Sequence, residues 1–260
     1  MLLFFNKPNF YWISFYICVL ISWMLLALMS QESLEFRSLE RIYGFDFWKQ
    51  LCTDSASLDH WSSILLMWVV MSFAMMAPTI IPALKTYDDL IYSGAGNFVG
   101  FFSLLMGFSI IWICYSILIT LLQIIMSDLG WLTSKGIIVS PFLVGLLLAL
   151  SGIYQFSPFK NACLSKCRAP LAFFLQNWSD GNLGAFKMGL RLGLICLGCC
   201  WMLMALTFVG GMMSLAFMGL CTVIMILEKL PQFGEYVTKP MGICFLGGAG
   251  LIWLKIINFV

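Results

Sequence analysis

The sequence has 260 residues, of which 62% are hydrophobic and only 10% are charged, and its formal net charge is +2. A soluble globular domain has about 25% charged residues, so this composition excludes an ordinary soluble domain. The small net charge, without any Lys/Arg-rich run, also argues against a nucleic-acid partner. The composition predicts an all-α protein, a polytopic transmembrane helical bundle in the lipid bilayer.

Apolar stretches recur along the whole chain, and a helix needs roughly 20 apolar residues to cross a bilayer core of about 30 Å. We expect one membrane domain, 1–260, with about seven spans, or six as the alternative. The apolar stretch 188–228 would be about 60 Å long as one helix, so a break is expected at Gly210–Gly211. The expected spans are 9–29, 62–83, 97–125, 137–156, 188–208, 211–228 and 240–258.

The Lys and Arg residues between the spans set the expected orientation, because cytoplasmic loops are enriched in both. With a cytoplasmic N-terminus, nine of the 14 Lys and Arg residues fall on the inner side. This orientation makes 30–61 an acidic outer loop and 157–187 a basic cytoplasmic loop. The first span is too long for a signal-peptide core, so we expect it to remain as a helix.

The second expected span contains the stretch MWVVMSFAMMAP. Met71 and Met75 lie four residues apart and share one helix face, with Met76 next to them. Thioethers are soft ligands that suit Cu(I), but methionine also fills irregular gaps between helices. The stretch therefore predicts either a copper-binding face or a packing face. Pro78 should free one backbone carbonyl of this helix.

A cysteine pair lies in the stretch FKNACLSKCRAP of the basic loop. Cys163 and Cys167 are four residues apart, hence on one side of a helical turn, and basic residues flank them: Lys160, Lys166 and Arg168. Such surroundings favour the thiolate, which is the form that binds metal. C-x3-C is nevertheless a weak metal signal compared with a doubled C-x2-C site. The alternatives are ordinary reduced cysteines or a thiol redox pair.

The stretch CLGCCWMLM places a third group of sulfurs in an apolar span. Cys196, Cys199 and Cys200 stand at i, i+3 and i+4 on one helix face, and Met204 extends that face. Two ionisable residues, Glu228 and Lys229, end the following span, where their charged groups could reach the bilayer surface. Sulfur in two antiparallel helices could converge on a metal, or serve only packing.

The chain contains a single histidine, His60, which we expect to act as an interfacial anchor beside Trp61. One histidine excludes bis-histidine haem, His-rich zinc sites and the two-His-one-carboxylate iron site from this chain alone. No phosphate-binding glycine loop and no hydrolase motif is found, so neither nucleotide binding nor enzymatic activity is expected. If metal binds, the remaining soft ligands favour Cu(I).

The three sulfur-bearing stretches together resemble a bacterial family of predicted metal-binding integral membrane proteins of unassigned function. The resemblance covers most of 62–230. It is carried by Trp68, Met71, Ala74, Met75, Met76 and Pro78; by Tyr154, Pro158, Phe159, Lys160, Cys163, Cys167, Arg168 and Pro170; and by Gly198, Cys199, Cys200, Trp201, Met204, Gly210, Gly211, Met212, Met218, Glu228 and Lys229. The resemblance implies a metal-related role in the bacterial inner (plasma) membrane.

We therefore predict a multi-pass protein that binds a soft transition metal, with Cu(I) the best match, for transport or for delivery to a membrane enzyme. Cys163 and Cys167 would exchange metal at the cytoplasmic face. The embedded site would use Cys199, Cys200, Met204, Met71, Met75 and Met76. The expected partners are the lipid bilayer and a metal chaperone or membrane metalloenzyme. The alternative is a structural or assembly subunit of a membrane complex, in which Cys and Met serve helix packing.

Overall fold

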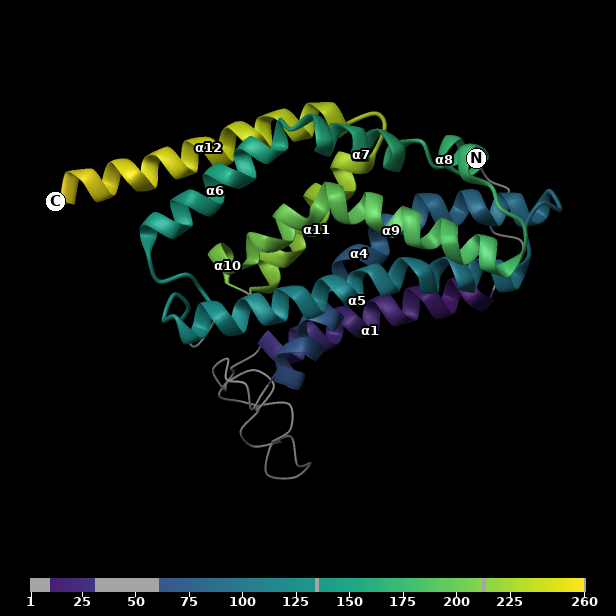
Figure 1. Cartoon of the computed structure of the whole chain (residues 1–260), viewed down its shortest axis with the longest axis horizontal. Helices are drawn as coiled ribbons and strands as arrows, with labels where there is room; N and C mark the ends of the chain where they lie inside the picture. Colours follow the sequence, from purple (N-terminus) through teal and green to yellow (C-terminus); the bar gives the residue numbers. More distant parts are fainter. Residues whose placement is uncertain (1–9, 31–60, 134–135, 212–213, 260) are drawn as a thin grey trace, which may run out of the picture.

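The computed structural model describes residues 10–30, 61–133, 136–211 and 214–259, and in these ranges the regular elements are helices (Figure 1). This confirms the all-α prediction. The acidic outer loop, with His60, lies outside the described residues, as does Met212. The helices are α1 (Phe10–Ser30), α4 (Trp61–Tyr92), α5 (Phe98–Asp128), α6 (Pro141–Gln155), α7 (Pro158–Arg168), α8 (Pro170–Asn177), α9 (Gly181–Ala205), α10 (Thr207–Gly210), α11 (Leu215–Lys229) and α12 (Gly234–Phe259).

Each of the seven expected spans contains a helix among its described residues, but not every one of these helices is long enough to cross a bilayer. Five helical segments have the required length and apolarity: α1, α4, α5, α9 with α10, and α12. A sixth is formed by α6 and α7 if this pair, bent by 60°, counts as one span. The 15 residues of α11 extend only about 22 Å at ~1.5 Å per residue. The alternative count of six therefore fits the helix lengths better than seven.

The expected break between α9 and α11 is confirmed. The short helix α10 ends at Gly210, and Gly211 has a φ of 89°, a backbone conformation that L side chains rarely adopt. The chain therefore reverses at this glycine pair, and α11 returns beside α9. The amino end of α11 is capped by Ser214, whose side chain accepts a hydrogen bond from the Phe217 amide.

The expected basic loop 157–187 contains two helices. Ser157 caps α7 by accepting a hydrogen bond from the Phe159 amide, and Pro158 occupies the first turn, where its missing N–H costs nothing. Pro170 likewise occupies the first turn of α8, which has no side-chain cap. The predicted helical arrangement of Cys163 and Cys167 is thus found in α7, which packs against α9.

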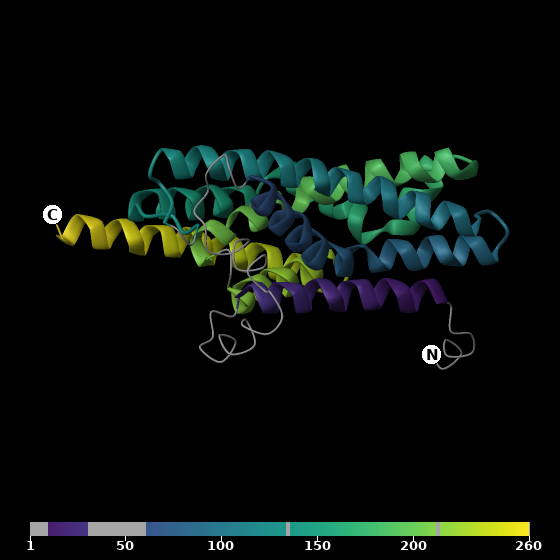
Figure 2. The same cartoon turned by 90° about the horizontal axis from the view of Figure 1, so that it is seen from below.

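The helix α9 lies in the centre of the bundle, with α5 and α7 packed against it (Figure 1). The α5 backbone approaches so closely at Gly189 that a Cβ there would collide with the Leu104 carbonyl, which explains the small residue. By contrast, α12 packs mainly on α6, and its carboxyl end extends beyond the other helices (Figure 2). The sulfur-bearing stretches of α4 and α9 lie in a core formed by α4, α5, α9 and α11, and the stretch of α7 packs against α9.

The proline in α4 has the predicted effect. Pro78 has no N–H to donate to the carbonyl of Ala74, four residues earlier, and this carbonyl instead accepts a hydrogen bond of 3.0 Å from Trp23 Nε1 of α1. A second contact holds α1 on α4, since the carboxylate of Asp88 accepts hydrogen bonds from Tyr11 and Trp12. The first helix is therefore fixed to α4 by polar contacts at two levels.

Candidate metal centre

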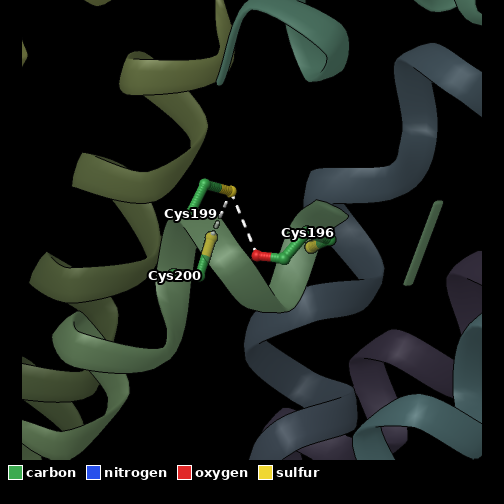
Figure 3. Close-up of side chains that lie close together, drawn as sticks. All are labelled: Cys196, Cys199 and Cys200. Atoms are coloured by element: carbon green, nitrogen blue, oxygen red, sulfur yellow. Dashed lines mark hydrogen bonds between the residues drawn. The ribbon is translucent and has the colours of Figure 1, made fainter. Parts of the chain in front are cut away.

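Three cysteine thiols of α9 converge inside the bundle (Figure 3). The Sγ atoms of Cys196, Cys199 and Cys200 all lie within 4.8 Å of one another. The Cys199 and Cys200 sulfurs are 3.2 Å apart, and the Cys199 thiol also contacts the Cys196 carbonyl oxygen at 3.1 Å. The three side chains are at most 2% exposed, and all three are free thiols. The i, i+3, i+4 spacing therefore produces a compact group of three sulfurs.

A buried cation completes this group from a different helix. Lys229 of α11 is 7% exposed, and its Nζ donates hydrogen bonds to Cys196 Sγ at 3.0 Å and to Thr79 Oγ1 at 2.8 Å. Thr79 belongs to α4, so α4, α9 and α11 meet at this point. The sequence allowed Lys229 to extend to the bilayer surface, but its ammonium group is directed into the protein.

The neighbouring residue Glu228 is buried as well. Its carboxylate forms an ion pair of 2.9 Å with Lys160 of α7, and both side chains are 1% exposed. Gln155 at the end of α6 hydrogen-bonds to both partners. The Glu228 carboxylate is paired with Lys160. In the described part of the chain, Lys229 therefore hydrogen-bonds to the hydroxyl of Thr79 and the thiol of Cys196. The positive charge of Lys229 therefore acts on the cysteine group.

The structure places the predicted exchange pair beside the cysteine group of α9. Cys163 and Cys167 are half-buried, and the Cys163 sulfur lies 2.8 Å from the position that a Cβ on Gly198 would take. Helix α7, which carries both cysteines, packs along α9. Two of the three flanking basic residues face Glu228 rather than the thiols: Lys160 through the ion pair, and Arg168 through a hydrogen bond of 2.9 Å to the Glu228 carbonyl.

The predicted thioether ligands are all buried, and their role as ligands stays a prediction. Met71, Met75 and Met204 are 0% exposed and belong to the hydrophobic core. Met76 lines a cavity of about 80 Å³ between α4 and α5, whose lining contains Phe108 but no cysteine. The Met76 carbonyl does reach the metal centre indirectly, because it accepts a hydrogen bond from Thr79.

Sequence reasoning missed three participants of this centre. Cys196 was recognised on the shared helix face but left out of the predicted ligands, although its spacing provided the signal. Thr79 gave no signal, because nothing in the sequence links it to a cysteine more than a hundred residues away. Lys229 carried an ambiguous signal, since an ionisable residue at a span's end can face either water or the protein interior.

Comparison with known protein families places most of the chain in one of them. A family model described as "PpoB2: Copper chaperone" matches residues 65–252 of the chain, from α4 to α12. The matched range includes the cysteines of α7 and α9 and also Lys229. No curated protein and no solved structure matches the chain.

Proposed function

The chain belongs to the PpoB2 copper chaperone family, and on this basis we propose that it binds Cu(I) as cargo at the cysteines of α9 and delivers it to a membrane metalloenzyme. The proposal rests on the convergence of Cys196, Cys199 and Cys200. Two metal–thiolate bonds of about 2.3 Å span roughly 4.6 Å, and the three sulfurs lie within 4.8 Å of one another. One ion can therefore contact at least two of them with little movement of α9.

The type and number of ligands favour Cu(I) over zinc. Structural zinc sites use four ligands, whereas the group on α9 has three sulfurs and neither histidine nor carboxylate. Thiolates are the soft ligands that suit Cu(I). A site with few ligands also suits a carrier, because the cargo must leave again. We therefore assign this chain a carrier role rather than a catalytic one.

The charge balance of the site fits the same cargo. Cu(I) bound by two thiolates carries one net negative charge, which is costly to bury without a compensating cation. Lys229 supplies that cation at 3.0 Å from Cys196 Sγ. A charged hydrogen bond of this kind contributes about 1.5–3 kcal/mol. We infer that Lys229 stabilises the copper-loaded site.

The proposed location is the bacterial inner membrane, with the N-terminus in the cytoplasm. The long apolar helices are compatible with several crossings, and the distribution of Lys and Arg favours this orientation. In this arrangement Cys163 and Cys167 would receive copper on the cytoplasmic side, where a metal chaperone is the expected donor. The thioethers of Met204, Met71, Met75 and Met76 remain candidate additional ligands.

The test is metal content after anaerobic purification with Cu(I) and zinc. We expect near-stoichiometric copper in the wild-type protein and its loss in the double variant Cys199→Ser/Cys200→Ser. The matched control is Cys114→Ser/Cys244→Ser, because both residues are exposed on other helices and should not affect copper. Absence of copper from the folded wild-type protein would favour the alternative of a structural or assembly subunit with packing cysteines.

A further inference from the structure

An open groove lies where the carboxyl end of α12 passes the start of α6. The two helices run antiparallel and side by side (Figure 1). The groove has a volume of about 490 Å³, within the roughly 300–1,000 Å³ that is typical of ligand-binding pockets. It shares no lining residue with the metal centre. Six of the lining residues are apolar and come from the segment before α6, from α6 and from α12: Ile138, Val139, Pro141, Val144, Ile252 and Ile256.

The segment before α6 forms a wall that backbone hydrogen bonds hold in place. Leu132 and Ile138 pair as an antiparallel bridge, and the Val139 amide donates a hydrogen bond of 2.9 Å to the Trp131 carbonyl. The Ile138 amide donates a hydrogen bond of 3.1 Å to the Phe208 carbonyl of α10. Because this wall is already formed, a ligand in the groove loses less affinity to ordering than it would on a flexible segment.

Lys255 of α12 is the single charged residue of the groove lining. Its side chain is exposed, and among the described residues it has no ion-pair partner. A lysine near the end of a membrane helix can lay its aliphatic stem on an apolar surface and extend its ammonium group to the polar head groups. The groove therefore combines apolar walls with one cation that is available to an anion.

Tryptophans beside the groove indicate its depth in a bilayer. Helix α12 is long and apolar enough to cross a membrane. Trp253, two residues before Lys255, stacks on Phe142 of α6 with the ring centroids 6.2 Å apart, and Trp131 is 45% exposed. Tryptophan is enriched at membrane–water interfaces. For a membrane-spanning α12, the groove and Lys255 therefore lie at the level of the lipid head groups.

We propose that this groove binds one anionic phospholipid, with an acyl chain against the apolar walls and the phosphate beside the Lys255 ammonium group. A neutral lipid offers the chain without the net charge, and a soluble anion offers the charge without the chain. A second copy docked through the same surface about a two-fold axis would bring two Lys255 side chains together, which is unfavourable. The proposal does not depend on copper binding.

The first test measures lipid binding to the full-length protein in detergent by native mass spectrometry. We expect dioleoyl phosphatidylglycerol to bind more tightly than dioleoyl phosphatidylcholine, which has the same chains. Lys255→Met should weaken phosphatidylglycerol binding about fivefold and leave phosphatidylcholine binding unchanged. The control is Lys239→Met, near the other end of α12 and also exposed, which should keep the wild-type affinity. Equal binding of the two lipids, or equal losses in the two variants, would overturn the proposal.

The second test fills the groove without changing its charge. Val144→Trp should weaken phosphatidylglycerol binding at least fivefold, whereas Ile153→Trp, on an exposed position of the same helix outside the groove, should not. Helix content by circular dichroism should match the wild type in both variants. Unchanged binding in folded Val144→Trp would overturn the proposal.

Two further outcomes would assign the groove to a different occupant. Glycerol 3-phosphate has the head-group charge without chains, and we expect it not to bind. Binding of glycerol 3-phosphate that Lys255→Met removes would replace the lipid with a soluble phosphate. A wild-type dimer that Val144→Trp dissociates would replace the lipid with a second copy of the chain. Either result would overturn the lipid site and leave the copper proposal unaffected.

Discussion

The cysteine group of α9 and the interface between α4 and α5, which contains Met76, are both buried but have different polar neighbours. Beside Cys196 lies the ammonium group of Lys229, and the buried ion pair of Lys160 and Glu228 is adjacent. The polar groups of α4 that face α5 are neutral: Trp68 Nε1 donates a hydrogen bond of 2.6 Å to Gln123, and the Ser72 and Ser116 hydroxyls are 3.1 Å apart.

This difference indicates where a charged cargo can be bound. Burial of an ion is costly unless compensating charge lies nearby. The region around α9 contains fixed charges that can balance a copper–thiolate group, whereas the neutral hydrogen bonds between α4 and α5 favour a well-packed interface. Sulfur content alone therefore does not distinguish a metal centre from a packing face, and the neighbouring charges do.

The largest expected effect is a loss of protein stability when the buried ion pair beside the cysteine group is broken. Glu228→Gln leaves Lys160 as a buried unpaired cation, so we expect the free energy of unfolding in detergent to fall by about 3–5 kcal/mol. The corresponding loss in the neutral region, Ser72→Ala, should cost only about 1 kcal/mol. Glu235→Gln is the matched control, because Glu235 is exposed in the first turn of α12, and its effect should stay below about 1 kcal/mol. Equal losses at Glu228 and Ser72 would contradict the comparison.

A smaller effect is expected on copper affinity when the buried cation is removed. Lys229→Met should weaken Cu(I) binding about 10- to 100-fold, which corresponds to about 1.4–2.8 kcal/mol. Competition with a Cu(I) chelator measures the change. Lys229→Arg keeps the positive charge and should retain more affinity than the methionine variant. Lys239→Met, on the exposed surface of α12, is the control. Wild-type affinity in Lys229→Met would show that Lys229 does not compensate the site.

The smallest effect on stability and on Cu(I) affinity is expected when methionines of α4 are replaced. Met71→Leu and Met75→Leu conserve volume, so each should change the free energy of unfolding by less than about 1.5 kcal/mol. If these residues serve packing, Cu(I) affinity should stay within about threefold of wild type. A tenfold fall in affinity with unchanged stability would instead make the α4 thioethers ligands, as the sequence pattern allows.

The local features of this protein follow from its sequence. Helical periodicity predicted the shared face of Cys196, Cys199 and Cys200, and the glycine pair predicted the reversal before α11. Pro78 predicted a freed carbonyl, because proline lacks the N–H that every other residue offers. Each of these predictions depends on neighbours within one or two helical turns, which the sequence displays directly.

Only the tertiary structure determines which distant residues lie next to these locally predicted features. An ionisable residue at the end of an apolar helix can face water or the protein interior with the same sequence around it, and Lys229 faces the interior because Thr79 and Cys196 accept its hydrogen bonds there. In the same way, the packing of α7 on α9 brings the Cys163 sulfur next to Gly198, the residue that precedes Cys199. Such contacts join residues far apart in the chain, and they depend on how whole helices pack, which no local pattern specifies.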